Sequence, residues 1–482
     1  MALHRSNDPH LGMDEDIYGS TASTNPVPRH RLMQTGIRAD EAAALVRDEL
    51  FLDGNAKQNL ATFCSTWLDP QIHELMNVSI DKNMIDKDEY PATAEIEKRC
   101  VHILADLWHS PEAADTIGCS TTGSSEACML GGLALKWKWR ERMKAAGKPA
   151  DRPNLVTGPV QVCWHKFSRY FDVELREIPL ERDRLSMSAE EVLKRVDENT
   201  IGVVPTFGVT FTGQYEPVKE IADALDRLAR DGGPDVPIHV DAASGGFIAP
   251  FVEPDLIWDF RIPRVRSINA SGHKFGLAPL GVGWVVWRDQ QDLPEDLIFY
   301  VNYLGGNMPT FALNFSRPGG QIISQYYLFL HLGRDGYRRI QNNCYSVAQH
   351  LAREVPKLGP FELFFNADSR NGLPAVSFTI RAGEEPGYSL FDLSDRLRVR
   401  GWQAAAYTML PNIPDVAVIR FIIRHGFSRD MADMLLEDIR RSVQHLDAHR
   451  PSTPTTPAEG TQFTHHALPK EKLPATARIA AE

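Results

Sequence analysis

Short apolar runs alternate with amphipathic helical stretches through the middle of the chain. Apolar positions recur at helical spacing in three stretches, Ala94–Trp108, Ala127–Ala146 and Val218–Ala229, which we predict to be helices. Short apolar runs predict strands at Asn154–Val156, Gln161–Trp164, Ile201–Thr206, Val236–Asp241, Val265–Ala270 and Gly283–Trp287. Such alternation favours βαβ crossovers and a mainly parallel sheet with helices around it.

A second pattern follows after about residue 320. Two helical stretches lead into a smaller α+β portion, where strands are expected near Ala375–Ile380 and Val416–Ile423 and helices near Ser389–Arg400 and Arg429–His449. The first two stretches are Gln321–Leu332 and Gly336–Leu358. Near the start of the chain, Asp40 is a plausible N-cap for a helix that reaches Leu52.

These patterns divide the chain into four parts. We expect an N-terminal segment over 1–57, a large domain over 58–344, a small C-terminal domain over 345–450 and a flexible tail over 451–482. The tail opens with three prolines among serine and threonine and has too little apolar content to form a core.

Composition and charge exclude several classes of function. The net charge of −11 argues against nucleic-acid binding and against adhesion to anionic membranes. No apolar run approaches 18 residues, and the N-terminus has no signal-peptide core. The six cysteines form no CxxC pair and no metal-ligand spacing, so we expect reduced thiols, no metal and a cytoplasmic location.

Lys274 is the first candidate for chemistry. It follows Ser271-Gly272-His273 and precedes an apolar, glycine-rich stretch that resembles buried core. A lysine that loses solvation there gains access to its neutral, nucleophilic form, which imine formation requires. The alternative is a lysine whose stem packs on apolar neighbours while its ammonium group reaches water.

Two further features suit the same chemistry. The Gly/Ser/Thr-rich turn over 118–126 runs into a helix, where free N–H groups could hold a phosphate or serve as an ordinary N-cap. Asp241 ends a predicted strand, where open sheets gather ligands, although a turn-forming aspartate is the alternative. An imine-forming lysine, a phosphate turn and a carboxylate for a ring nitrogen together fit pyridoxal 5'-phosphate.

The motifs around these residues resemble the pyridoxal-phosphate-dependent group II decarboxylases, and within them the bacterial and plant glutamate decarboxylases. The resemblance covers roughly residues 40 to 450. It rests on six motifs, namely Asp53-Gly54-Asn55-Ala56-Lys57-Gln58-Asn59-Leu60-Ala61-Thr62-Phe63, Thr122-Gly123-Ser124-Ser125-Glu126-Ala127, Cys163-Trp164-His165-Lys166-Phe167, His239-Val240-Asp241-Ala242-Ala243-Ser244-Gly245-Gly246, Ser271-Gly272-His273-Lys274-Phe275-Gly276, and Gly305-Gly306 with Asn314-Phe315-Ser316-Arg317-Pro318. It implies a fold-type I enzyme of the α/β class, with a mainly parallel sheet in the large domain, a smaller C-terminal α+β domain and a helical N-terminal segment.

The resemblance also implies roles for individual residues. Lys274 would form the imine, Asp241 would pair with the ring nitrogen and His165 would lie over the ring. The remaining cofactor contacts would come from Ser124, Ser125, Thr210, Ala243, Ser271, His273 and, from a neighbouring subunit, Ser316. Glutamate would be held by Thr62, Phe63, Gln161 and Arg424, with Asn83 and Asp86 contributed across a dimer. For Arg424 a surface ion pair is the alternative.

The implied reaction is decarboxylation of L-glutamate to 4-aminobutyrate and CO₂ through an external aldimine of pyridoxal phosphate. Each turnover would consume a proton, which suggests a role in acid resistance. The expected partner is a second copy of the chain in a homodimer, with hexamers left open. Calmodulin is not expected, because the segment after 450 contains no tryptophan.

Two questions stay open at this level. His465 and His466 resemble a C-terminal histidine that closes the site in bacterial relatives, or they belong to a disordered tail. The rival functions are another pyridoxal-phosphate enzyme, such as an aromatic-amino-acid decarboxylase or an aminotransferase, and a non-enzymatic scaffold that binds the cofactor for stability alone.

Overall fold

The computed structural model describes residues 27–303, 308–409, 413 and 416–456 of the 482-residue chain. The chain divides into two compact units, Met1–Gln58 and Asn59–Glu482. The described part of the first unit contains helix α1 (Ala39–Leu50) and the 3₁₀ turn η3 (Ala56–Gln58). The predicted N-cap is wrong, because Arg38 occupies that position and Asp40 lies in the first turn, where it pairs with Arg38 at 2.6 Å.

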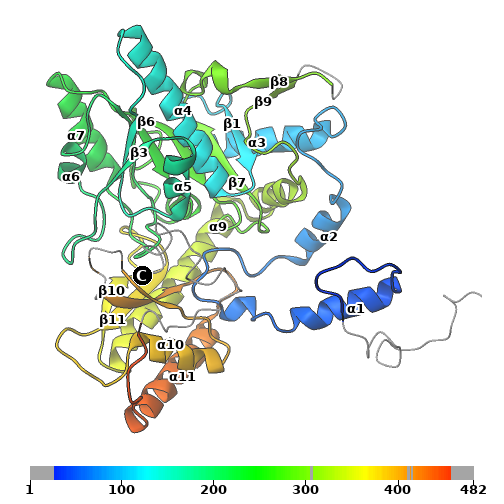
Figure 1. Ribbon diagram of the computed structural model, residues 1–482, viewed down its shortest axis with the longest axis vertical. Coiled ribbons are helices and arrows are strands. Elements are labelled where there is room, and N and C mark those ends of the chain that lie inside the picture. The colour runs from blue at the N-terminus through cyan, green and yellow to red at the C-terminus, as the bar shows by residue number, and fades with distance from the viewer. Residues whose placement is uncertain (1–26, 304–307, 410–412, 414–415, 457–482) are drawn as a thin grey trace, which may run out of the picture. The chain divides into compact units, whose positions relative to one another are not determined.

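A seven-stranded sheet with the order β1-β7-β6-β5-β4-β2-β3 is the centre of the second unit (Figure 1). Strands β3, β2, β4, β5 and β6 are parallel, and β7 is antiparallel to both of its neighbours, β6 and β1. This arrangement confirms the predicted mainly parallel sheet. The strands are β1 (Gly118–Thr121), β2 (Asn154–Thr157), β3 (Glu174–Glu177), β4 (Thr200–Val204), β5 (Ile238–Asp241), β6 (Val265–Ala270) and β7 (Gly283–Trp287).

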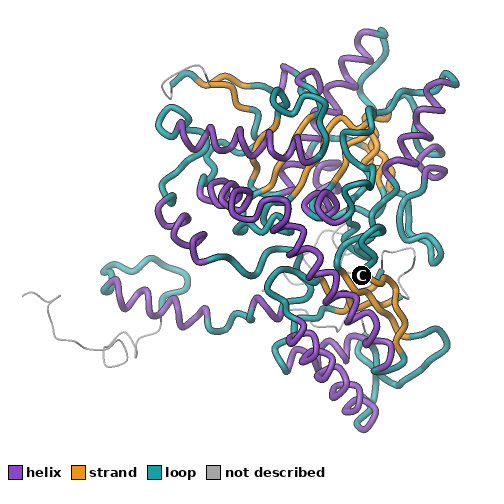
Figure 2. Tube along the Cα trace, turned by 180° about the vertical axis from the view of Figure 1, so that it is seen from behind, coloured by secondary structure: helices purple, strands orange, loops and turns teal. Residues whose placement is uncertain are grey.

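Both faces of the central sheet are buried. Along β7, Trp284 and Val286 pack into one apolar cluster, whereas Val285 and Trp287 pack into another. Since successive side chains of a strand point to opposite faces, the sheet must be covered on both sides, and Figure 2 shows helices around it. These helices are α2 (Pro70–Val78), α3 (Pro91–Leu107), α4 (Ser124–Ala145), α5 (Val162–Tyr170), α6 (Ala189–Leu193), α7 (Val218–Arg230) and α8 (Ala249–Val252).

Helix α9 (Gly320–Glu354) connects the central sheet with a second, smaller sheet (Figure 1). It contacts α2, α3 and α8, and also β10, β11 and α11. Gly333 interrupts it with a φ of 54°, a conformation that glycine adopts without steric cost. The sequence pattern, which predicts two helices here with a gap between 332 and 336, therefore locates the break correctly.

The smaller sheet is antiparallel throughout and has its own core. Its order is β10-β11-β13-β12, and Phe378 and Phe421 from its central strands pack with Leu393 of α10 and Ile439 of α11. Its elements are β10 (Phe361–Asn366), β11 (Ala375–Ile380), α10 (Leu390–Val399), β12 (Ala406–Thr408), β13 (Ala417–Ile422) and α11 (Arg429–Ala448). The domain boundaries at 344/345 and 450/451 stay predictions, and α9 passes through the first.

The remaining described elements are short. A two-stranded ribbon consists of β8 (Phe299–Val301) and β9 (Met308–Thr310). The 3₁₀ turns are η4 (Gly245–Phe247), η5 (Gln290–Asp292), η6 (Glu295–Leu297) and η7 (Val355–Lys357). Among the described residues, no helix has both the length and the apolar character that crossing a membrane requires.

Two sequence predictions in the large domain are wrong. Gln161–Trp164 is not a strand, because Gln161 is the N-cap of α5 and its side chain accepts the backbone N–H of Cys163 at 2.7 Å. A short apolar run does not distinguish a strand from the first turn of a helix. The turn predicted over 118–126 contains strand β1, and α4 begins at Ser124 rather than Ala127.

The buried side chain of Glu216 connects three segments, around Gly158, Met187 and Thr206. Its carboxylate accepts the backbone N–H groups of Thr206 at 2.7 Å and Met187 at 2.8 Å. The side chain also fills the space beside Gly158, where a Cβ would lie 2.1 Å from Oε1. Burial raises the pKa of Glu216 to about 7, and this effect outweighs the two N–H donors, which lower the pKa.

This raised pKa predicts how stability varies with pH. Between the ordinary glutamate pKa of 4.5 and about 7, the folded chain retains a proton at Glu216 that the unfolded chain releases. The contribution is therefore complete below pH 4.5 and is lost as pH rises through 7, by on the order of 3 kcal/mol. Urea unfolding should give a lower free energy of unfolding at about pH 7.5 than at about pH 5, and this difference should be smaller in Glu216→Gln. Equal drops in both proteins would contradict this assignment.

Candidate active site

The turn after β6 presents Lys274 at the carboxyl edge of the central sheet. Ser271 is fully buried and donates its backbone N–H to the carbonyl of Ala243 at 3.0 Å. Lys274 is only partly buried, and its Nζ lies 5.4 Å from the centre of the Phe63 ring. Backbone hydrogen bonds therefore hold this turn while Lys274 is partly exposed, which corrects the expectation of a buried lysine.

His273 is neutral and presents a defined N–H group. Burial, with a smaller contribution from Lys274, lowers the pKa of His273 to about 4. Its Nδ1 accepts the backbone N–H of Val282 at 3.2 Å, so the proton of the neutral ring is on Nε2. The ring lies against Gly123, where a Cβ would be 3.1 Å from Cε1.

The turn before α4 forms a set of hydrogen-bond donors beside Lys274. The hydroxyl oxygens of Ser124 and Ser271 are 2.6 Å apart. This contact brings the start of the 22-residue helix α4 to residues 271–274, the lysine turn. A Cβ at Gly283 would lie 2.5 Å from the backbone of Gly123, so only glycine allows β7 to pack this closely. Hydroxyls and free N–H groups at a helix N-terminus fit a phosphate group.

Asp241 ends β5 and is 3% exposed. Its carboxylate accepts the indole N–H of Trp164 at 2.8 Å and the side-chain amide of Asn269 at 3.0 Å. The backbone N–H of Ala243 adds a third donor at 3.2 Å. This carboxylate is fixed at a strand end and is linked to the turn of Lys274 through Ala243. Such a carboxylate fits the ring nitrogen of pyridoxal phosphate.

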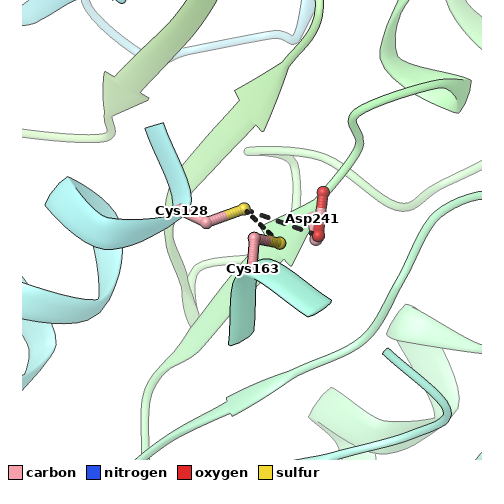
Figure 3. A group of neighbouring side chains, drawn as sticks. All are labelled: Cys128, Cys163 and Asp241. Atoms are coloured by element: carbon pink, nitrogen blue, oxygen red, sulfur yellow. Dashed lines mark hydrogen bonds between the residues drawn. The ribbon is translucent and has the colours of Figure 1, made fainter. Parts of the chain in front are cut away.

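Two thiols lie beside this carboxylate (Figure 3). One ligand atom from each of Cys128, Cys163 and Asp241 lies within 4.8 Å of the others, a spacing compatible with a metal ion. Cys128 donates to Oδ2 of Asp241 at 3.6 Å, and Cys163 donates to Cys128 at 3.8 Å. Burial raises the pKa of the Cys128 thiol well above its usual value, so it stays protonated. The two thiols and the carboxylate are joined by hydrogen bonds.

The residues predicted to face the cofactor ring lie on three different segments of the chain. His165 lies on α5, one residue after Trp164, with its Nε2 3.5 Å from Glu177. Burial lowers the pKa of His165, and Arg169 adds to this effect. Ala243 bridges Asp241 and Ser271 through its backbone, whereas Thr210 lies in the turn after β4.

The segment 59–65 is joined directly to the lysine turn. Ser65 donates its hydroxyl to the carbonyl of Lys274 at 2.7 Å and its backbone N–H to the carbonyl of His273 at 2.8 Å. Thr62 and Phe63 are therefore held next to Lys274 although they are far from it in sequence. Leu60 in turn exchanges backbone hydrogen bonds with Gln403 and Ile422, which connects the segment to the small sheet.

Two arginines of the small sheet approach this segment. Arg424, predicted to bind substrate, uses Nη1 and Nη2 to hold the carbonyls of Cys64 and Asn59. Arg420 on β13 places its guanidinium 4.5 Å from the centre of the Phe63 ring, the ring that Lys274 approaches from another side. Gln161 is engaged as the N-cap of α5.

Asn83, Asp86 and Ser316 form a separate cluster. The side chain of Asn83 donates to the hydroxyl of Ser316 at 3.3 Å and accepts the backbone N–H of Arg317 at 3.1 Å. Asp86 donates its backbone N–H to the carbonyl of Asn83. Three residues that the sequence assigns to a neighbouring subunit thus lie together on one chain. His465 and His466 lie outside the described residues.

The family model described as the pyridoxal-dependent decarboxylase conserved domain matches residues 33–381. The chain belongs to the pyridoxal-dependent decarboxylase family. It is 60% identical to a glutamate decarboxylase of Aliivibrio fischeri, over 96% of this chain and all of that protein. A glutamate decarboxylase of Solanum lycopersicum is 47% identical, over 92% of this chain and 88% of its own length.

Two solved structures share this fold. Lactobacillus brevis glutamate decarboxylase superposes with a TM-score of 0.86 at 47% identity, over 90% of this chain and 98% of that one. A Burkholderia pseudomallei sphingosine-1-phosphate lyase, at 21% identity, has a TM-score of 0.73 over 89% of this chain and 96% of its own and shows the shared fold alone. Pyridoxal phosphate is the family's cofactor, and the donors around Lys274 fit it.

Sequence reasoning assigned no role to three residues of this site. Trp164 and Asn269 hold Asp241, and Arg420 faces Phe63. Asn269 could have been found from strand periodicity, because it lies in the same register as Asp241 on the next strand. Arg420 carried no such signal, since its approach depends on how the small sheet meets segment 59–65.

Proposed function

We propose that this decarboxylase converts L-glutamate to 4-aminobutyrate and CO₂. The observation that carries the proposal is the 60% identity, over nearly the whole chain, to a protein named glutamate decarboxylase. The attachment of segment 59–65 to the lysine turn supports it, because it holds Thr62 and Phe63 beside Lys274. Polar groups there can meet the second carboxylate that separates glutamate from monocarboxylic amino acids.

Each side chain of the site has a definable task in this reaction. When bound, pyridoxal phosphate supplies an aldehyde for the substrate amine and an electron-accepting ring. Lys274 would hold that aldehyde between turnovers, Asp241 would hold the proton of the ring nitrogen, and His165 would cover the ring. Ser124, Ser125, Ser271 and the Nε2–H of His273 would bind the phosphate.

The reaction balances with the uptake of one proton. The bond between Cα and the α-carboxylate breaks, CO₂ leaves, and a proton takes its place on Cα. Each turnover therefore removes one proton from solution, which makes a role in acid resistance a reasonable extension of the proposal. The six cysteines, all unpaired, support a cytoplasmic location.

The α-carboxylate requires a cation, and we propose Arg420 for this role. Nη1 and Nη2 of Arg424 each donate one hydrogen bond to a backbone carbonyl. Arg420 is 8% exposed and donates Nη2 to the carbonyl of Ala61, and its planar group can pair with a carboxylate through two parallel hydrogen bonds. Arg424 then acts by holding segment 59–65 in place.

We also propose a homodimer in which Asn83, Asp86 and Ser316 complete the partner's site. Their mutual contacts support this, since they would move into a neighbouring site as one unit. Large apolar side chains beside the β8–β9 ribbon are exposed by 45% to 73%, a pattern typical of protein interfaces. They are Phe299, Tyr300, Tyr303, Leu313 and Phe315.

The first prediction tests the reaction itself. Purified enzyme should release CO₂ from glutamate in preference to aromatic amino acids and should raise the pH of a weakly buffered medium. Lys274→Ala should lower turnover by on the order of a thousandfold or more, because the amine that holds the cofactor is lost. Release of CO₂ from aromatic amino acids alone, or transamination of glutamate, would refute the proposal.

The roles of Arg420 and Arg424 can be distinguished by comparing the binding of the substrate glutamate with that of the product 4-aminobutyrate, since 4-aminobutyrate lacks the α-carboxylate. Arg420→Lys should weaken glutamate binding about tenfold or more relative to inhibition by 4-aminobutyrate, because bidentate pairing is lost. Arg424→Lys should weaken both ligands about equally and lower the melting temperature. The reverse pattern would return the role to Arg424.

Mixing two inactive variants tests the shared site. Lys274→Ala and the double variant Asn83→Ala/Asp86→Ala are each expected to have little activity. Random mixing makes half of the dimers mixed, each with one intact site of two, so about one quarter of native activity should return. No recovery, with mixed dimers demonstrated by mass, would place Asn83 and Asp86 in their own chain's site.

A further inference from the structure

The carboxylate of Asp241 is surrounded by donors that come from four different segments. Oδ2 accepts from Trp164 of α5 at 2.8 Å and, more weakly, from Cys128 of α4 at 3.6 Å. Oδ1 accepts from Asn269 of β6 at 3.0 Å and from the backbone of Ala243 at 3.2 Å. Figure 3 shows the two thiols approaching Asp241 from the side of α4 and α5. Each oxygen therefore has one short side-chain donor.

A second layer of hydrogen bonds fixes the orientation of Asn269. Its amide nitrogen faces Asp241, so its Oδ1 faces Nε2 of His239, at 2.8 Å. Nε2 must therefore be the donor of His239, and Nδ1 accepts the hydroxyl proton of Ser267 at 2.7 Å. Burial lowers the pKa of His239, which keeps the ring neutral and in this tautomer.

The fold makes specific room for this arrangement. His239 and Asp241 are two residues apart on β5, so both side chains point to the face that α4 covers. On α4, a Cβ at Gly131 would lie 2.4 Å from the imidazole of His239, and only glycine leaves space for the ring. Trp164 packs edge-on against the same imidazole, with ring centres 5.4 Å apart.

We infer that Trp164 and Asn269 are positioning residues that set the direction of the Asp241 carboxylate toward the ring nitrogen of the cofactor, with His239 setting the direction of Asn269. This inference rests on the proposed function only in requiring the cofactor ring at Asp241, and not on the identity of the amino-acid substrate.

The physical reason is that a carboxylate at a strand end could rotate about its terminal bond. Two short side-chain donors on opposite oxygens remove that freedom and hold the carboxylate in one orientation. A carboxylate held in this orientation can accept a hydrogen bond from the ring nitrogen, whereas a rotated one would not.

The chain contains a matched control for each residue. Asn154 of β2 is fully buried, donates its amide to Asp197 at 2.8 Å and accepts from Thr200 at 2.7 Å, far from the lysine turn in the sheet order. Trp402, next to the small sheet, donates its indole N–H to Asp438 at 2.8 Å. Both have the same local chemistry as Asn269 and Trp164 but no link to Asp241.

The experiment compares Asn269→Leu with Asn154→Leu, and Trp164→Phe with Trp402→Phe. Cofactor affinity is measured by titrating the cofactor-free full chain with pyridoxal phosphate. Protonation of the ring nitrogen is measured from its ¹⁵N chemical shift in the loaded enzyme, with cofactor labelled at that atom. All four variants should lose stability, because each leaves a carboxylate with one donor fewer.

Only the variants next to Asp241 should change the affinity for the cofactor and the protonation of its ring nitrogen. We expect Asn269→Leu and Trp164→Phe to bind it about tenfold or more weakly, with the ¹⁵N shift moved toward the unprotonated value. The inference is overturned if both retain native affinity and a native shift, or if the control variants change these readouts equally. Since no readout uses glutamate, failure of the proposed reaction would be seen separately. Should Asn269→Leu not fold, Trp164→Phe alone decides.

Discussion

A buried negative charge at the end of a parallel strand is the constraint on which this site depends. Asp241 is almost completely removed from water, and an unpaired carboxylate there would be costly. The chain meets that requirement with donors from α5, β6 and the following turn, so the positions of these elements are coupled. Glycine at 131 and the neutral tautomer of His239 are consequences of the same requirement.

The lysine turn is the second point of convergence. Ser65 ties it to segment 59–65, Ser271 ties it to the start of α4, and Ala243 ties it to Asp241. Cofactor-binding and substrate-facing groups therefore share one rigid backbone. Arg424 and Arg420 extend this connection to the small sheet, so the position of that sheet sets the position of Phe63.

Much of the architecture was predictable from local pattern. The runs at 265–270, 283–287 and 375–380 match β6, β7 and β11 residue for residue, because buried strands are nearly continuous apolar runs. Gln161–Trp164 failed because one capping side chain converts a similar run into a helix. Motifs in the sequence identify Lys274, Asp241 and Ser124 as candidate site residues, whereas no motif identifies Arg420 or Asn269.

The sequence by itself determined the family, the cofactor chemistry and the identity of the lysine, since these depend on residue types at short spacing. Only the tertiary structure decided how those residues are held. Trp164 of one helix and Asn269 of a neighbouring strand meet Asp241 at the end of a third element, and a hydrogen bond's direction depends on coordinates that no local pattern contains. The same holds for the two arginines, whose roles differ because one faces backbone carbonyls and the other faces the ring of Phe63.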